Sequence, residues 1–344
     1  MSARLLALRG SNNEGVLAAV LVVLVIVMSA VSPSFFTVGT LAAVVRSSIV
    51  PVIFALAVLI VIVSGGIDVS FAAIAIFAAY TTVKVSGRGE ATAPLIVLVL
   101  MALAIGAVLG LVNGALIARF RLPTLIVTLG TQSVFKGALL TYIGSRYIAD
   151  LPPSMDRFSK TNLLSVHTSG SPANLSLMVV VPLALAVFVW WLMRNTMFGR
   201  GVYAIGGDVE AARRAGFRVV RSQLLVYVLV GMLAAAGGVV YVILGRNANP
   251  QDLVGGELDI IAAVVLGGAS IFGGRGSVGG TVLGVLLVQL INNSLLLVGV
   301  PAAWQRAAVG VLLVIGVGVQ AATAKRTNRR VLVYNTLDTV EVAR

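Results

Sequence analysis

Residues 93–117 read APLIVLVLMALAIGAVLGLVNGALI and contain no charged side chain. As a helix this segment would rise about 37 Å, which is enough to cross the hydrocarbon core of a bilayer, about 30 Å thick. Apolar runs of similar character recur along the chain. We expect about ten membrane-spanning helices, at residues 15–32, 42–63, 70–86, 93–117, 124–143, 174–193, 222–244, 259–272, 277–298 and 304–323. The recurrence predicts an all-α, polytopic membrane protein.

The composition of the whole chain indicates that lipid, and not water, surrounds most of it. Hydrophobic residues make up 59% of the 344 residues and charged residues 11%, whereas soluble domains carry about 25% charged residues. A soluble globule of this size could not bury so much apolar surface. The alternating strands of an outer-membrane barrel are absent from the sequence. These observations exclude a soluble enzyme.

The basic residues fall on alternate loops between the expected helices, and cytoplasmic loops collect Lys and Arg. With both termini in the cytoplasm, the cytoplasmic segments hold Arg4, Arg9, Arg119, Arg121, the run from Arg194 to Arg221, Arg275 and the tail from Lys325 to Arg330. We therefore predict a cytoplasmic N-terminus (1–14), a transmembrane domain (15–323) with a cytoplasmic loop at 194–221, and a basic cytoplasmic tail (324–344). This distribution accounts for the net charge of +13 without a nucleic-acid partner.

The sequence also limits the chemistry that the chain can perform. It has no cysteine and a single histidine, His167, whereas protein metal sites need several ligands. The glycine-rich stretch GGASIFGGRGSVGG (267–280) lacks the G-x-x-x-x-G-K-[ST] pattern that cradles phosphates, and that pattern occurs nowhere else in the chain. We expect no catalytic residue, no metal site, no bound cofactor and no ATP hydrolysis by this chain.

The cytoplasmic loop reads RNTMFGRGVYAIGGDVEAARRAGFRVVR (194–221) and predicts a short amphipathic helix. Gly206 and Gly207 predict a turn, Asp208 can cap a helix start, and Gly216 can end the helix as a C′ glycine. So short a helix is unstable alone in water. It therefore either docks on a protein surface or lies on lipid headgroups.

Several polar and glycine residues interrupt the apolar runs, and polar groups at membrane depth usually face a bundle interior or a water path. Few of them are ionisable, which argues against a proton- or sodium-driven pump and suits either a path for a hydroxyl-rich solute or hydrogen bonding between helices. The segment SGGIDVS (64–70) is either a capped re-entrant turn or a broken helix that lines a cavity. The candidate path residues are Gly65, Gly66, Asp68, Ser70, Asn113, Thr128, Thr131, Gln132, Asn292 and Asn293.

Five stretches together resemble the permease subunits of bacterial ribose-, monosaccharide- and autoinducer-2-type ABC importers. They occur in the family's order and cover most of the chain. The stretches are SGGIDVS (64–70), LVNGALIARFRLPTLIVTLGT (111–131), FGRGVYAIGGDVEAARRAGF (198–217), GELDIIAAVVLGGASIFGGRGSVGGTVLG (256–284) and INNSLLLVGVPAAWQ (291–305).

The resemblance implies a vitamin-B12-importer-like (type II) bundle in the bacterial plasma membrane. It implies that a sugar or sugar-like solute is delivered by an extracytoplasmic sugar-binding protein, that ATP and Mg bind a separate cytoplasmic ABC ATPase, and that a second permease copy or paralogue completes a homo- or heterodimer. The helix at 208–216 would be the coupling helix on that ATPase. The implied coupling residues are Gly206, Gly207, Asp208, Glu210, Arg213, Arg214 and Gly216.

One departure concerns the residues after SGGIDVS, where relatives commonly carry a Val-Gly pair and this chain has Phe71 and Ala72. We expect the width of the path to differ there. The alternative function is an ion- or proton-coupled secondary transporter of a small polar solute, which would depend on a coupling ion and need no ATPase.

Overall fold

The computed structural model describes residues 14–32, 35–87, 93–168 and 171–301, together with residues 304, 307, 310, 311 and 314. The expected N-terminal segment up to residue 13, most of the tenth helix (304–323) and the basic tail (324–344) lie outside the described residues. Within the described ranges the chain is mainly helical, as the apolar runs predict.

The apolar runs coincide with α2 (Glu14–Val31), α3 (Val38–Val63), α4 (Phe71–Val85), α5 (Leu95–Phe120), α6 (Thr124–Ala138), η1 (Leu139–Ile143), α8 (Val180–Asn195), α11 (Val219–Gly245), α12 (Glu257–Leu266) and α13 (Val278–Leu297). The connections between them hold α7 (Pro153–Lys160), β1 (Asn162–Thr168), β2 (Ser171–Ser176), η2 (Leu177–Val179), α9 (Met197–Gly207) and α10 (Val209–Arg214). Among the described residues, α3, α5, α8 with η2, α11 and α13 are long and apolar enough to cross a membrane by themselves.

Two predicted helices have different bounds in the structure. The helix expected at 174–193 begins at Val180, because residues up to Ser176 pair with β1 in an antiparallel hairpin. The helix expected at 259–272 runs from Glu257 to Leu266. It ends there because the next residues turn, with Gly268 at a φ of 94°, a conformation that only glycine adopts without strain.

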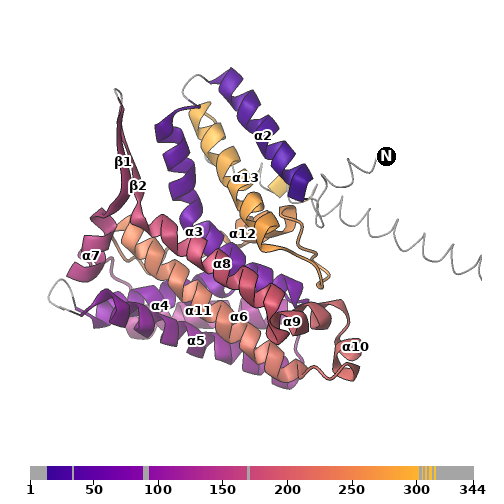
Figure 1. Ribbon diagram of the computed structural model, residues 1–344. Coiled ribbons are helices and arrows are strands. Elements are labelled where there is room, and N and C mark those ends of the chain that lie inside the picture. Colours follow the sequence, from indigo (N-terminus) through magenta and orange to yellow (C-terminus); the bar gives the residue numbers. More distant parts are fainter. Residues whose placement is uncertain are drawn as a thin grey trace, which may run out of the picture.

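Helix α3 is the central element of the bundle. Figure 1 shows it passing from the group formed by α2, α12 and α13 into the layer formed by α4, α5, α6, α8 and α11. Its residues from Val52 to Val63 are all buried in the main hydrophobic core. Its first half packs differently, because Val44 forms a separate small core with Phe35 and Leu290, covered by α2. Pro51 lies between the two halves and removes one backbone hydrogen bond from the helix.

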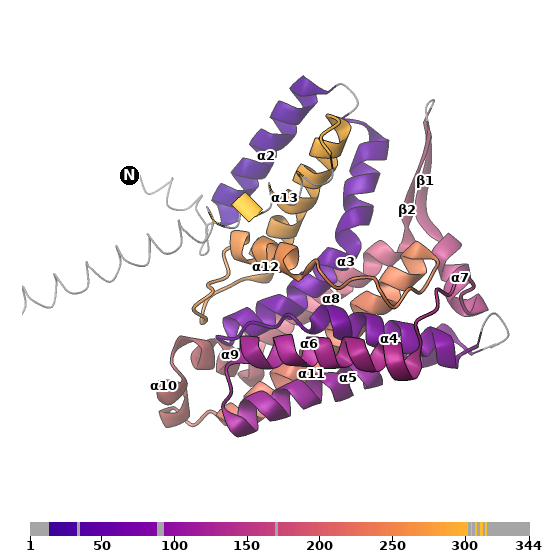
Figure 2. The same cartoon turned by 180° about the vertical axis from the view of Figure 1, so that it is seen from behind.

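Helices α5 and α11 cross with their backbones in contact. A Cβ added at Gly106 would lie 2.3 Å from the carbonyl oxygen of Gly231, and one added at Gly110 would lie 2.2 Å from the carbonyl oxygen of Tyr227. Glycines of this kind let membrane helices approach closely and gain dispersion contacts. In Figure 2, α5 lies along the lower edge of the layer with α11 beside it.

The bundle has two distinct ends, because α9 and α10 lie at one end and α7 with the β1–β2 hairpin lies at the other (Figures 1 and 2). We refer to them as the α10 end and the α7 end. At the α7 end, the connection between η1 and α8 contains α7 and the β1–β2 hairpin. Ile148 pairs with Ala248 across an antiparallel bridge, and the side chain of Met155 is fully buried.

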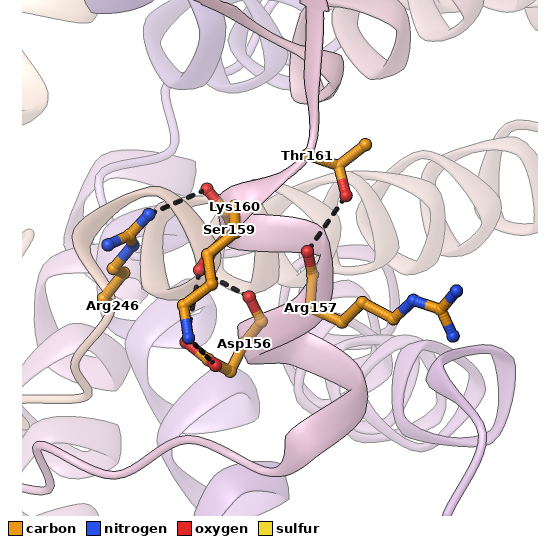
Figure 3. Close-up of polar contacts among 6 residues, drawn as sticks. All are labelled: Asp156, Arg157, Ser159, Lys160, Thr161 and Arg246. Atoms are coloured by element: carbon orange, nitrogen blue, oxygen red, sulfur yellow. Dashed lines mark hydrogen bonds and ion pairs between the residues drawn. The ribbon is translucent and has the colours of Figure 1, made fainter.

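Polar contacts hold α7 against the end of α11. Lys160 forms an ion pair with Asp156 one turn earlier, and the Ser159 hydroxyl donates to the Asp156 carbonyl at 2.7 Å. Figure 3 shows Arg246, at the end of α11, donating to the Ser159 carbonyl at 3.5 Å. The Lys160 ammonium, as a hydrogen-bond donor, lowers the pKa of the Asp156 carboxyl.

Candidate functional site

Loop 194–221 folds into two short helices instead of one. Thr196 begins α9 by accepting the Gly199 N–H at 3.2 Å. Asp208 begins α10 by accepting the N–H groups of Glu210 and Ala211 at 2.8 and 2.9 Å. The predicted cap is therefore confirmed, and these backbone donors, Ala211 first, lower the pKa of the Asp208 carboxyl. Gly216 ends the helix with a φ of 89°, as predicted for a C′ glycine.

Helix α10 is supported by its own chain. Ala212 is buried against Ile205 of α9 and Val219 of α11, and Phe217 covers this small core. The opposite face carries Glu210 and Arg213, which form an ion pair, together with exposed Arg214. Ala212 is therefore already covered, whereas Val209 (40% exposed) and the charged side chains remain open to a protein partner or to lipid headgroups.

The predicted turn at Gly206 and Gly207 is wrong, because both residues lie in the last turn of α9. Gly206 is needed for close packing: a Cβ there would lie 1.8 Å from the carbonyl oxygen of Val63 and 2.7 Å from the amide nitrogen of Gly274. Gly207 is exposed, and a Cβ added to it would meet nothing within 4 Å. Two adjacent glycines therefore have different structural roles.

Three Gly-Gly segments meet beside Gly206. The Gly274 N–H donates to the Val63 carbonyl at 2.9 Å. A Cβ at Gly273 would lie 2.4 Å from the Gly206 carbonyl oxygen and 2.9 Å from the Gly65 Cα. We name Gly65, Gly206, Gly273 and Gly274 the glycine junction. It joins loop 194–221 to the break after α3 and to the connection between α12 and α13.

The break after α3 is a re-entrant segment. From Gly65 (φ 86°) the chain returns into the bundle without regular structure until α4 begins at Phe71. The Phe71 and Phe54 ring centroids are 5.4 Å apart, and Phe54 lies about 13 Å along α3 from Val63. Helix α4 therefore starts deep within the bundle.

Four of the predicted path residues form one buried polar cluster around this segment. The Asp68 Oδ1 accepts from both the backbone N–H and the hydroxyl of Ser70, each at 2.7 Å. The Asn113 Nδ2 of α5 donates to the Ser70 Oγ at 2.7 Å. Thr128 of α6 accepts from the Val69 N–H and donates to the Ile67 carbonyl, each at 3.3 Å. The cluster links three elements, and Asp68 accepts from both polar groups of Ser70, the N-cap residue of α4, whose own side chain makes no cap hydrogen bond.

The remaining predicted path residues lie elsewhere. Thr131 donates to the Thr128 carbonyl at 3.4 Å. Gln132 donates to the buried Glu257 carboxylate at 2.6 Å. Asn293 donates to the Ser47 hydroxyl at 3.1 Å, whereas the buried Asn292 Oδ1 accepts no hydrogen bond within the described part of the chain.

The structure adds two partners of the 64–70 segment that the sequence analysis missed, Tyr227 and Thr124. Gly66 lies against the Tyr227 hydroxyl and the Thr124 methyl group, because a Cβ there would be 3.0 and 3.2 Å from these atoms. Thr124 also accepts the Ile67 N–H at 3.0 Å. No signal in the sequence could reveal these contacts, because Thr124 lies in α6 and Tyr227 in α11, both far from Gly66 along the chain.

Comparisons with known proteins show the family to which the chain belongs. Residues 40–317 match the family model described as "Branched-chain amino acid transport system / permease component". The chain is 34% identical over 298 residues to the ribose import permease protein RbsC of Escherichia coli (strain K12), covering 86% of this chain and 90% of the relative. It is 31% identical over 303 residues to the autoinducer 2 import system permease protein LsrC of Yersinia pseudotuberculosis serotype O:3 (strain YPIII), covering 88% and 83%. No solved structure matches.

These matches define a class of membrane protein, the transport-system permease. The chain belongs to the family of branched-chain amino acid transport system permease components, within its ribose and autoinducer-2 type of ABC importer permease. It is a multi-pass protein of the inner membrane, as the apolar helices require.

Proposed function

We propose that the chain forms the path through which a sugar or sugar-like solute is imported after delivery by an extracytoplasmic binding protein. Relatives named as ribose and autoinducer 2 import permeases support this solute class. The buried cluster around Ser70 and Asn113 supports it too, because most of its groups are uncharged and could exchange hydrogen bonds with a hydroxyl-rich solute. A second permease copy or a paralogue completes the path.

The energy comes from a separate ABC ATPase, which binds ATP and Mg and docks on α10. The observation that carries this proposal is the division of α10 into a face covered by its own chain and a charged face that is open. Because Ala212 already holds α10 against its own chain, the helix does not depend on lipid for its position. The exposed Glu210, Arg213 and Arg214 suit the polar groove of a protein partner.

The glycine junction then transmits ATPase closure to the membrane segments. A displacement of α10 moves α9, because Ala212 packs on Ile205. Gly206 of α9 packs against the Val63 carbonyl at the end of α3 and the Gly274 amide of the α12–α13 connection, and Gly65 lies beside it. Backbone contacts without intervening side chains transmit small displacements with little loss, since packed interiors have low compressibility.

A charge-swap experiment tests ATPase docking. The double variant Glu210→Lys with Arg213→Glu keeps an oppositely charged pair within α10 but inverts the pattern offered to a partner. The matched control, Asp156→Lys with Lys160→Glu, makes the same kind of swap in α7. We expect the α10 swap to abolish co-purification with the co-expressed ATPase and sugar uptake, and the α7 swap to keep the ATPase bound. Equal ATPase binding by both variants would contradict the docking site.

Labelling tests the orientation, in which the α10 end and both termini are cytoplasmic. The chain has no cysteine, so a single Glu210→Cys or Arg157→Cys substitution provides a unique thiol. An impermeant maleimide added to intact cells should label the variant at Arg157 and not the variant at Glu210, and lysis should expose Glu210→Cys. Uptake that follows an ion gradient in the absence of any ATPase would instead establish the secondary-transporter alternative.

A further inference from the structure

A cavity of about 550 Å³ lies between the first half of α3 and the ends of α4, α11 and α12. One wall is a stripe on α3 that contains Ala43, Ser47, Val50 and Phe54, residues that share a helix face because they are spaced by three or four positions. None of the predicted path residues lines it. Phe71 and Ala72, where we expected the width of the path to differ, do line it, so the cavity adjoins the buried polar cluster around Ser70 without including it.

Two further sides of the cavity are bounded by a pair of aromatic rings and by the connection between α11 and α12. The paired rings of Phe54 and Phe71 form the floor. The roof is the connection between α11 and α12, which contributes Leu253. Hydrogen bonds hold that connection, since the Tyr241 hydroxyl donates to Asp252 at 3.0 Å and the Lys136 ammonium donates to the Gln251 carbonyl at 3.2 Å.

The lining suits a hydrocarbon better than a sugar. It is mostly apolar, and its hydroxyl groups already have partners: Ser47 donates to Val44 and accepts from Asn293, and Tyr241 donates to Asp252. A sugar that left water here would lose hydrogen bonds without replacement, which is costly. A dry apolar cavity of about 150 Å³ holds a benzene molecule. By that scale this cavity has room for roughly twenty carbon atoms.

Arg46 is the single charged residue among the described residues that line the cavity. It is exposed at the mouth, and its guanidinium donates to the carbonyl of Leu244, the penultimate residue of α11, at 3.2 Å. It forms no ion pair within the described ranges. A guanidinium offers five N–H donors, so most remain for an anion. This contact places the guanidinium beside the end of α11, and the ends of a membrane-spanning helix are expected near the lipid headgroups.

We propose that this cavity binds an acyl chain of an anionic phospholipid from the leaflet at the α7 end, with the lipid phosphate against Arg46. The hydrocarbon fills the space above the Phe54–Phe71 pair, and the guanidinium supplies charge-assisted hydrogen bonds of the kind that Arg forms with phosphate. The inference is independent of the sugar and ATPase assignments, because it uses only the shape, polarity and charge of the cavity.

Lipid titration of the purified, delipidated full chain tests the site. Dioleoyl phosphatidylglycerol and dioleoyl phosphatidylcholine have identical acyl chains and differ in headgroup charge, so native mass spectrometry with each lipid separates the two contributions. We expect one tightly held phosphatidylglycerol, with an affinity roughly tenfold or more above that of phosphatidylcholine. Arg46→Gln should remove this preference while retaining weak binding of both lipids.

Two further variants make the result specific to the cavity. Ala43→Trp places a bulky side chain at the exposed mouth and should weaken the binding of both lipids. Arg246→Gln removes an exposed cation at the same end of the bundle that does not line the cavity, and should leave the preference unchanged. Equal binding of both lipids to the unaltered chain, an undiminished preference in Arg46→Gln, or displacement of the lipid by added ribose would overturn the proposal.

Discussion

Substitution of Gly206 by Ala should disconnect loop 194–221 from the membrane segments. The added Cβ would lie 1.8 Å from the Val63 carbonyl oxygen, whereas real Cβ atoms essentially never approach another atom within 3.0 Å. The two backbones must therefore separate by at least about 1.2 Å. The oxygen belongs to the backbone and the position of a Cβ is fixed by its own backbone, so no side-chain rotation can relieve the clash.

The energetic cost follows from that separation. Overpacking of this kind costs about 1–3 kcal/mol. The displacement also strains the hydrogen bond from the Gly274 N–H to the same Val63 carbonyl, at 2.9 Å, and losing it adds about 1 kcal/mol. A total of about 2–4 kcal/mol is too little to prevent insertion of a large helical bundle, but it is enough to displace α9 from the glycine junction.

The assay compares Gly206→Ala with Gly207→Ala, its neighbour in the same helical turn. We expect the Gly206 variant to reach the membrane at normal levels, to bind the ATPase, and to lose solute uptake together with solute-stimulated ATP hydrolysis. The Gly207 variant meets nothing within 4 Å and gains helix propensity of up to about 1 kcal/mol, so its uptake should match that of the unaltered chain. Normal uptake by Gly206→Ala, or equal loss in both variants, would refute the reasoning.

Three further predictions concern other contacts. Asp208→Ala should speed amide exchange in α10 at neutral pH, whereas Asp208→Asn should preserve the cap. The folded-state pKa of Asp208 is lowered, so the stabilisation by its carboxylate is present above the ordinary pKa of about 3.9 and is lost as the pH falls through the lowered pKa. The Asn variant should lack this pH dependence. Gly231→Ala would place a Cβ 2.1 Å from the Gly106 carbonyl oxygen and should lower the thermal unfolding temperature in detergent by forcing α5 and α11 apart, an overpacking cost of about 1–3 kcal/mol. Gln132→Leu removes a donor at 2.6 Å from buried Glu257 and should lower the free energy of unfolding by about 1–3 kcal/mol. Gln132→Glu should lower it further, because two carboxylates would then face each other.

The helical architecture could be predicted because the bilayer imposes a simple rule on sequence. A segment such as 93–117 has to satisfy its backbone polar groups internally, and only a helix or a closed barrel does so. The start and the end of α10 could also be predicted from the sequence. Asp208 and Gly216 lie within one turn of the backbone groups they serve, and the structure confirms both.

What the sequence could not show depends on contacts between distant segments. The hairpin from Asn162 to Ser176 forms through strand pairing at the α7 end, where the bilayer rule gives no guidance. Gly206 and Gly207 have the composition of a turn, yet α9 continues through them because Gly206 packs against Val63. The repetition of Gly-Gly at 65–66, 206–207 and 273–274 was visible, but the sequence did not indicate that these pairs meet.

The backbone contact between α5 and α11 has a consequence for how transport can occur. With Gly106, Gly110 and Gly231 touching main chain to main chain, these two helices have no side-chain layer that could slide or repack between them. We therefore expect α5 and α11 to move together as one rigid unit. The conformational changes of transport are then expected to fall on the irregular stretches that contain the glycine junction, and not between α5 and α11.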